Sequence, residues 1–321
     1  MQFKKLIIIL SDYLFSPITF LASVWLKLIR KYNVGLWGTL SPISKIIFKK
    51  VGVFPITNHY YEPLFDGSKL KSLRKDRNLP GLDLNADGQV AFLNSFNFSN
   101  ELLEISRLPK DQLNYSFSEA QFKVGDSCIL YSMIRNHKPS RIVEIGCGSS
   151  TLIIQHAIAY NVKENSDYVC EHICIEPYEN EWISKLNVHV ERKKVEDIDI
   201  SLFRNLNEND ILFIDSTHII RPQGDVLFEY LEVLPVLKKG VIVHIHDIFT
   251  PKDYLDEWVL DGVNFWNEQY LLEAFLSCNN QFEIICAVNY LKHNHFDLLS
   301  SRSPLLKEGN EPGSFWVRKL S

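Results

Sequence analysis

The chain has no excess of positive charge. Among its 321 residues, 34 Lys and Arg stand against 39 Asp and Glu, which gives a formal net charge of −5 and a pI near 6.1. Domains that bind nucleic acids usually carry a basic patch, so we expect no nucleic-acid partner. Hydrophobic residues make up 46% of the chain and aromatic residues 12%, which is typical of a globular protein and excludes bulk disorder.

Clustered cysteines, repeats and low-complexity tracts are also lacking. The six cysteines are scattered, and a chain of this size does not need disulfide bonds to fold. Cys170 and Cys174 are closely spaced, but no second Cys or His pair completes a structural zinc site. We therefore expect these cysteines to be small apolar core residues in a reducing cytosol.

Residues 6–29 form the most hydrophobic stretch, which is long enough to cross a bilayer, since crossing takes roughly 20 apolar residues. Asp12, Pro17 and Lys27 interrupt it, cations flank both ends, and no signal-peptide cleavage site follows. This symmetric charge favours a helix that lies in the interface of a membrane. A true span and a helix packed on the protein's own domain are the alternatives. In each case we expect a cytoplasmic catalytic domain, peripheral on the inner face of the membrane if the segment binds there.

Beyond this membrane-associating segment, 1–31, the chain divides into two further parts. Residues 32–118 are irregular and rich in turn signals, which predicts an N-terminal extension that wraps the main domain. Over 119–321, β-like runs alternate with helical segments, which indicates an α/β domain. The expected strands are 141–145, 172–175, 188–191, 211–214, 241–245, 282–287 and 315–318. The expected helices are 118–136, 150–160, 179–186, 199–206, 225–238 and 266–278.

This alternation predicts a Rossmann-like, doubly wound sheet of seven mostly parallel strands. Residues 288–313, between the last two strands, show no clear helix. We therefore expect the last strand to be antiparallel and to follow a long connection. In such open sheets, ligands bind at the carboxyl ends of the strands near the topological switch point.

The first expected strand ends in a glycine-containing loop, Glu144-x-Gly146-x-Gly148. Glycines let the backbone turn tightly and approach a ligand closely. Residues 149–151 are Ser-Ser-Thr, which can cap the helix that follows. The next strand ends in Glu176, where a carboxylate can accept both ribose hydroxyls of a nucleoside. Together these features predict a nucleoside-containing cofactor.

A dinucleotide-binding loop would need a third glycine at the position of Thr151. A pyrophosphate requires that close approach of the helix, whereas the zwitterion of methionine does not. The missing glycine therefore favours S-adenosylmethionine over NAD. An NAD-dependent sugar oxidoreductase and a non-catalytic, membrane-tethered cofactor-binding domain are the alternatives.

The segment 143–150 resembles the first motif of the class I S-adenosylmethionine-dependent methyltransferases. Glu176 is similar to their ribose-binding acid, 210–215 to their fourth-strand motif and 314–318 to their seventh strand. The resemblance covers about 119–321. It implies S-adenosylmethionine as the cofactor and, for this chain, O-methylation of a small-molecule or glycan hydroxyl.

The resemblance also implies roles for single residues. Glu144 is expected to orient the loop and the methionine ammonium group, and Gly146 and Gly148 to line the methionine and ribose. An acid after the third strand often meets the adenine, and there Glu196 and Asp197 are the candidates, of which Asp197 is chosen. The cofactor-binding set expected in full is Glu144, Gly146, Gly148, Ser149, Glu176, Asp197 and Asp215.

Three further segments, 59–63, 246–249 and 265–270, resemble a subgroup of methyltransferases found with bacterial surface-polysaccharide and natural-product pathways. This resemblance implies a small-molecule or glycan acceptor. The aromatic-rich stretch 249–270 interrupts the alternation of strands and helices, so we expect it to form a lid or a wall of the substrate site.

The strands that end at Asp215 and Asp247 should be neighbours, which opens their loops into one cleft. There His246 is expected to act as general base, because its side chain titrates near neutral pH, with His218 as the next candidate. Asp247 would orient that histidine or bind a metal. His244 lies inside its strand and is expected in the core. Asp215 and Asp247 are an alternative site for Mg²⁺, which prefers hard oxygen ligands.

Overall fold

The computed structural model contains two compact units, residues 1–71 and 72–321, which are considered one at a time. The described residues are 2–33, 42–109, 111–178 and 180–321.

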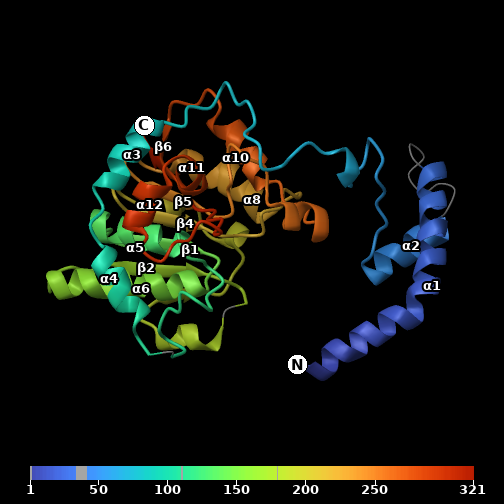
Figure 1. Cartoon of the computed structure of the whole chain (residues 1–321), viewed down its shortest axis with the longest axis horizontal. Coiled ribbons are helices and arrows are strands. Elements are labelled where there is room, and N and C mark those ends of the chain that lie inside the picture. The colour runs from blue at the N-terminus through green and yellow to red at the C-terminus, as the bar shows by residue number, and fades with distance from the viewer. Residues whose placement is uncertain (1, 34–41, 110, 179) are drawn as a thin grey trace. The chain divides into compact units, whose positions relative to one another are not determined.

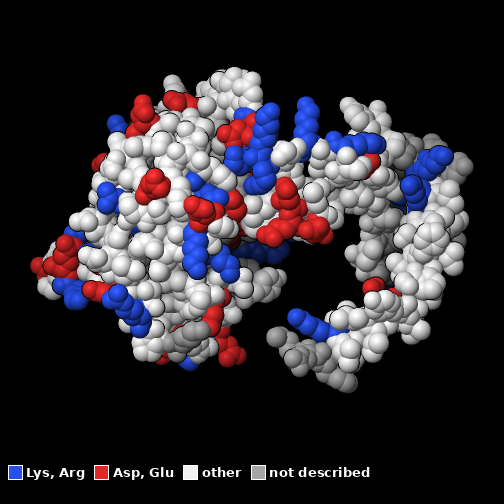
Figure 2. Space-filling model, viewed as in Figure 1, with Lys and Arg blue, Asp and Glu red and all other residues white. Residues whose placement is uncertain are grey.

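The first unit is built around a long apolar helix, α1 (Gln2–Asn33), and a shorter helix, α2 (Pro42–Val51). The part of α1 from Lys4 to Lys31 is long and apolar enough to cross a membrane by length and composition, with a mean hydropathy of 1.8. Its most apolar window has no buried residue in the described part of the chain. In Figure 2 the visible face of this unit is mostly uncharged between groups of Lys and Arg. Near the end of α1, Arg30 pairs with Glu62.

The second unit is built around one seven-stranded sheet with the order β3-β2-β1-β4-β5-β7-β6 (Figure 1). Each pairing from β3 to β5 is parallel, and β7 runs antiparallel to both β5 and β6. The predicted doubly wound sheet and its antiparallel last strand are therefore confirmed. The strands are β1 (Arg141–Ile145), β2 (Glu171–Ile175), β3 (His189–Glu191), β4 (Ile211–Ile214), β5 (Ile242–Ile245), β6 (Phe282–Ala287) and β7 (Phe315–Lys319).

Side chains alternate between the two faces of the sheet and build two cores. Ile142 of β1 belongs to the core on one face, under α5 (Asp126–His137) and α6 (Ser149–Glu164). Val143 and Ile145 belong to the core on the other face, under α8 (Asp225–Phe228) and α10 (Glu268–Leu276). Figure 1 shows these two helical layers on either side of the strands.

The region before α5 is more regular than expected. It contains α3 (Ala86–Asn94) and α4 (Ser99–Ser106), whose apolar residues join the core under α5 and α6. Leu93 and Leu102 are fully buried there. This stretch therefore packs as part of the second unit.

The prediction of a helix from residue 118 was wrong at its start, because α5 begins only at Asp126. Gly125 precedes it with φ +96°, and a Cβ at that glycine would lie 2.8 Å from Pro312. A backbone in this region cannot continue a right-handed helix, so residues 118–125 form turns. The turns place Phe122 and Lys123 in the lining of the acceptor cavity described below.

The expected helix over 225–238 is a single helical run with a wider turn inside it. A π-helical segment, Glu229–Val233, joins α8 to α9 (Leu234–Val236). Pro235 lacks the N–H group that would bond to the carbonyl group of Leu231, which accounts for the local widening.

The expected long connection over 288–313 is not irregular throughout. It contains α11 (Val288–Asn294) and α12 (Phe296–Arg302). Leu291 and Leu299 from these short helices are fully buried. Two helical segments of seven residues each gave too weak a periodicity to be recognised in the sequence.

Other helices are short. The segment expected at 179–186 is a 3₁₀ helix, η2 (Glu181–Lys185), and residue 179 lies outside the described residues. The segment expected at 199–206 is α7 (Ser201–Arg204). The acid pair after β3 lies in another 3₁₀ turn, η3 (Val195–Asp197).

Candidate functional site

The loop between β1 and α6 can be formed only with glycine at position 146. Gly146 has φ +81°, and a Cβ there would lie 1.9 Å from the backbone oxygen of Asp215. The loop is tied to both neighbouring strands, because Gly146 N donates to Ile175 O at 3.1 Å and Asp215 N donates to Ile145 O at 3.0 Å. Because the loop lies this close to its neighbouring strands, it does not fill the space beyond their carboxyl ends. A ligand can bind in that space, at the switch point of the sheet.

Glu144 lies below this loop, buried on the face covered by α6. Its carboxylate accepts hydrogen bonds from Ser150 Oγ at 2.6 Å and Thr151 Oγ1 at 2.9 Å, and it contacts His172 Nε2 at 2.9 Å. The side chain is fully buried. These contacts agree with the expected role of Glu144 in orienting the loop, and they direct both carboxylate oxygens away from the cavity.

A cavity of about 440 Å³, here the cofactor cavity, lies at the carboxyl ends of β1, β2 and β4. Gly146, Glu176 and Asp215 line it, as expected for cofactor-binding residues. Glu176 accepts a hydrogen bond from Tyr178 N at 2.7 Å, which fixes its carboxylate at the end of β2. Lys194–Glu196 closes the side next to β3.

Four other expected residues do not line the cofactor cavity. After β3, Glu196 lines it and Asp197 is exposed outside it, so the geometry favours Glu196, while the role predicted for Asp197 stays a prediction. Glu144, Gly148 and Ser149 are also absent from the lining among the described residues. Ser149 Oγ accepts a hydrogen bond from Gln121 N at 3.3 Å, which ties the start of α6 to the turn before α5.

A second cavity of about 970 Å³, here the acceptor cavity, adjoins the cofactor cavity. Asp215 lines both cavities and therefore lies at their boundary. His246, Asp247 and Trp258 line the acceptor cavity, so the predicted meeting of the β4 and β5 loops is confirmed. Further acids in the lining are Asp126, Asp256, Glu257, Asp261 and Glu311.

Two histidines face the carboxylates of Asp215 and Asp247. His246 Nδ1 lies 3.4 Å from Asp215 Oδ1 and 3.5 Å from Asp247 Oδ1. His218 Nε2 lies 3.4 Å from Asp215 Oδ1 and 3.4 Å from Asp247 Oδ2. On the other side of its ring, His218 Nδ1 contacts Glu268 Oε2 at 2.8 Å. His218 is buried behind the cavity wall, whereas His246 reaches the cavity itself.

These contacts set the charge of both rings. Burial would lower the pKa of His218, but Asp215 and Glu268 outweigh burial and raise its pKa to about 10. Burial would likewise lower the pKa of His246, and the carboxylates of Asp247 and Asp215 raise its pKa well above the usual value. The neighbouring carboxylates therefore favour the protonated form of each ring, and His246 can act as a general base only from its deprotonated form.

His244 lies in the core, as expected. It is fully buried, its ring stacks on Phe213 with centroids 4.1 Å apart, and its Nε2 contacts Ser314 Oγ at 2.9 Å. Burial lowers its pKa well below the usual value, so this ring is neutral. Its role is structural.

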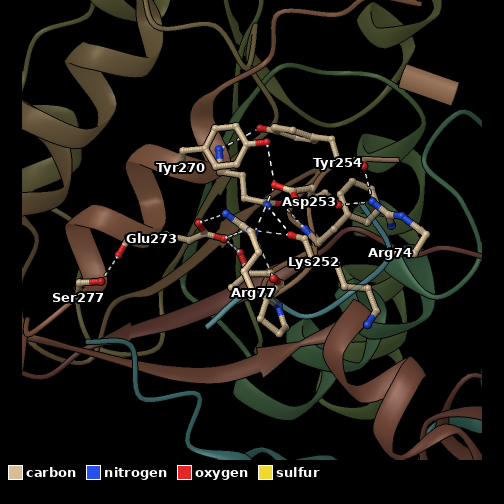
Figure 3. A network of polar contacts seen from close by, with 12 residues as sticks. Arg74, Arg77, Lys252, Asp253, Tyr254, Tyr270, Glu273 and Ser277 are labelled. Atoms are coloured by element: carbon tan, nitrogen blue, oxygen red, sulfur yellow. Dashed lines mark hydrogen bonds and ion pairs between the residues drawn. The ribbon is translucent and has the colours of Figure 1, made fainter. Parts of the chain in front are cut away.

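The segment after β5 forms a wall of the acceptor cavity, held in place by the polar network of Figure 3. Arg77 donates to Glu273 Oε2 at 2.8 Å and to the carbonyl oxygen of Lys252 at 2.9 Å. Arg74 donates to the carbonyl oxygens of Asp253 and Tyr254. Residues 74–77 thus fasten 252–254 to α10 and fix the wall.

Sequence reasoning missed Asp126 and Glu268. Asp126 is the first residue of α5 and accepts a hydrogen bond from Ser314 N at 2.6 Å, while its second oxygen lies 3.7 Å from His246 Nε2. Glu268 is the first residue of α10 and is fully buried against His218. The glycine before Asp126 was a usable signal for a helix start, whereas Glu268 reaches His218 only through the tertiary fold.

The strand order defines a doubly wound fold, and the cavity at the strand ends lies where such folds bind their ligands. A protein-family model described as "Methyltransferase domain" matches residues 143–248, which include the end of β1, the glycine loop and the strand end at Asp247. A protein of Archaeoglobus fulgidus, described as uncharacterised, is 30% identical over 178 residues, which cover 51% of this chain and 78% of that protein. The chain belongs to the family of class I S-adenosylmethionine-dependent methyltransferases.

Solved structures of methyltransferases are similar to this chain at a lower level. An O-methyltransferase from Bacillus cereus, in complex with S-adenosylhomocysteine, has 12% identity and a TM-score of 0.38, covering 71% of this chain and 100% of its own. The O-methyltransferase TomG from Streptomyces achromogenes, in complex with S-adenosylmethionine, has 14% identity and a TM-score of 0.38, covering 71% and 99%.

Proposed function

We propose that this S-adenosylmethionine-dependent methyltransferase methylates a hydroxyl oxygen of a small-molecule or glycan acceptor held in the acceptor cavity. The observation that carries the proposal is the position of Asp215, which lines both cavities. A methyl group leaving a donor in the cofactor cavity would enter the acceptor cavity beside this carboxylate. Methyl transfer is an in-line displacement in which alignment of the two reactants supplies much of the catalysis.

His246 and Asp247 are proposed to orient the acceptor hydroxyl and to assist the loss of its proton. Both line the acceptor cavity, next to Asp215. A hydroxyl oxygen becomes a better nucleophile when a neighbouring group takes its proton, a contribution of roughly 10²–10⁴-fold. Trp258 offers an aromatic ring in the same wall, which suits the apolar face of a sugar or an aromatic acceptor.

The resemblance to methyltransferases of bacterial polysaccharide and natural-product pathways supports the same acceptor class. The test is transfer of an isotope-labelled methyl group from S-adenosylmethionine into an extract of small molecules and glycans. Mass spectrometry should find a labelled O-methyl product that depends on the enzyme. Label confined to nitrogen or carbon atoms would contradict O-methylation while leaving the methyltransferase assignment intact.

We further propose that α1 holds the enzyme on the inner face of an anionic membrane without crossing it. Most of the apolar side chains of α1 are exposed in its unit, and Lys4, Lys5 and Lys31 are exposed cations at the two ends of the apolar stretch, whereas Arg30 pairs with Glu62. Interfacial helices combine such apolar surface with cations that contact anionic lipid headgroups.

The full-length protein should therefore sediment with vesicles of phosphatidylglycerol and phosphatidylcholine and less with phosphatidylcholine alone. A variant without residues 1–31 should stay in the supernatant and still bind S-adenosylhomocysteine. Equal sedimentation of both proteins would contradict the proposal. Protease protection of the N-terminus across a bilayer would show a true span instead.

A further inference from the structure

A further cavity of about 510 Å³, here the distal pocket, adjoins the acceptor cavity. Val124 and Asn310 line both cavities and therefore lie at their junction. The end of α4, the segment 114–118 and the loop over 305–310 form the other walls. Asp215 and His246 lie outside the lining of the distal pocket, so this pocket offers space to a part of the acceptor that does not react.

The size of the two cavities suits an extended ligand. Pockets for small molecules usually hold about 300–1,000 Å³. The acceptor cavity, at about 970 Å³, already lies at the upper end of that range. The distal pocket adds a separate space that is itself large enough for one unit of a ligand. A chain of linked units can occupy both cavities, whereas one compact molecule would leave the distal pocket empty.

The chemistry of the distal pocket differs from that of the acceptor cavity. Seven acidic side chains line the acceptor cavity, whereas the described lining of the distal pocket has no acid and one cation, Lys307. Its other polar side chains are uncharged hydroxyls and amides, those of Ser106, Asn114, Ser116, Ser118 and Asn310. Such groups can both donate and accept hydrogen bonds, as the hydroxyl groups of a sugar do. The distal pocket therefore suits a neutral polyhydroxyl unit.

An aromatic ring is fixed in the wall of the distal pocket. Phe117 packs edge-on against Tyr115, with ring centroids 4.8 Å apart. Tyr115 is buried and donates its hydroxyl hydrogen to the carbonyl oxygen of Phe122. The half-buried ring of Phe117 is therefore held in position where it lines the pocket, and such a ring suits the apolar face of a sugar.

Asn310 is held in place at the junction of the two cavities. Its Oδ1 accepts a hydrogen bond from Lys307 N at 2.8 Å, and its own backbone N donates to Lys307 O at 2.9 Å. These two bonds close a turn and leave the amide nitrogen, Nδ2, as a donor for a ligand. A ligand that passes from one cavity to the other would contact this group.

We propose that the acceptor is a glycan of at least two linked sugar units, with the methylated unit in the acceptor cavity and the neighbouring unit in the distal pocket. The inference rests on the proposed O-methylation and narrows its acceptor class. Phe117 packs against the face of the second sugar, and Asn310 donates to an oxygen near the linkage. The enzyme then binds oligosaccharides in preference to the single sugars that compose them.

The test measures binding to the full-length enzyme loaded with S-adenosylhomocysteine. The probes are oligosaccharides made by partial acid hydrolysis of the surface polysaccharide of the organism that encodes the enzyme, separated by size. Calorimetry should give roughly 10-fold or tighter binding for fractions of two or more units than for the monosaccharide fraction. Ser106→Trp should lower the oligosaccharide affinity to that of the monosaccharide, because an indole ring at the end of α4 would fill the distal pocket.

Ser184→Trp is the matched control and should keep the preference for longer chains. Like Ser106, Ser184 is an exposed serine whose Oγ donates to the carbonyl oxygen three residues earlier, at 2.7 Å in both cases. Ser184 lies outside the lining of the three cavities. S-adenosylhomocysteine binding shows that each variant is folded. Ser118→Trp should act like Ser106→Trp and carries the test if Ser106→Trp does not fold.

Equal affinity for all size fractions, or an unchanged preference for longer chains in both Ser106→Trp and Ser118→Trp, would overturn the inference. Methyl transfer to the hydroxyl of another small molecule would then leave the proposed function intact. Methyl label confined to nitrogen or carbon atoms would contradict the proposed O-methylation instead. In that case, length-dependent binding that Ser106→Trp removes would still support a glycan site in the distal pocket.

Discussion

Gly146→Ala should weaken the binding of S-adenosylhomocysteine by roughly 100-fold. The new Cβ would lie 1.9 Å from the backbone oxygen of Asp215, and the residue has φ +81°, which L side chains rarely adopt. Relief of this clash must move the loop away from β4 or move Asp215, and both line the cofactor cavity. Strain of about 3 kcal/mol at such a position corresponds to roughly a 100-fold loss of affinity. Calorimetry measures the loss.

Gly148→Ala is the matched control in the same loop. Gly148 has no atom within 4 Å of an added Cβ in the described structure and does not have a positive φ. We therefore expect Gly148→Ala to keep the thermal stability of the wild type, whereas Gly146→Ala lowers it. Wild-type affinity for S-adenosylhomocysteine in Gly146→Ala would show that the loop does not form the cofactor site.

His246→Ala should lower turnover by roughly 10²–10⁴-fold with little change in cofactor affinity. His246 lines the acceptor cavity and not the cofactor cavity, so its loss should affect the chemical step and spare donor binding. The expectation holds whether the ring removes a proton or binds a metal. Asp247→Asn should also slow turnover, because it removes the carboxylate that His246 and His218 both face.

The control for these variants is His189→Ala, an exposed histidine on β3 away from both cavities, which should retain turnover. Treatment with EDTA separates the two roles of His246. Loss of activity that Mg²⁺ or another divalent ion restores supports a metal in the site, and indifference to EDTA supports a base acting alone. Near-wild-type turnover of His246→Ala on the true acceptor would refute both roles and direct attention to His218.

The fold was predictable because its signals are local. Each strand of the sheet is a short apolar run, and the glycine loop after β1 marks the switch point. Gly146 was recognisable for the same reason, since a tight turn between a strand and a helix commonly requires glycine. The meeting of Asp215 and Asp247 followed from the order of β4 and β5.

Other features of the site were harder to predict from the sequence. Glu144 shares the strand face of Ile142, so alternation along β1 could have shown that it points toward α6 and not into the cavity. After β3, a 3₁₀ turn places Glu196 in the lining of the cofactor cavity and exposes Asp197, a difference that the two neighbouring acids do not reveal in the sequence. The pairing of Glu268 with His218 spans 50 residues and leaves no periodic signal.

The central claim is that the cavity at the ends of β1, β2 and β4 binds the methyl donor. Titration calorimetry of the purified protein with S-adenosylhomocysteine and with NAD tests it most directly. The account predicts one binding site for S-adenosylhomocysteine and no measurable heat with NAD. Tight NAD binding with no response to S-adenosylhomocysteine would contradict it.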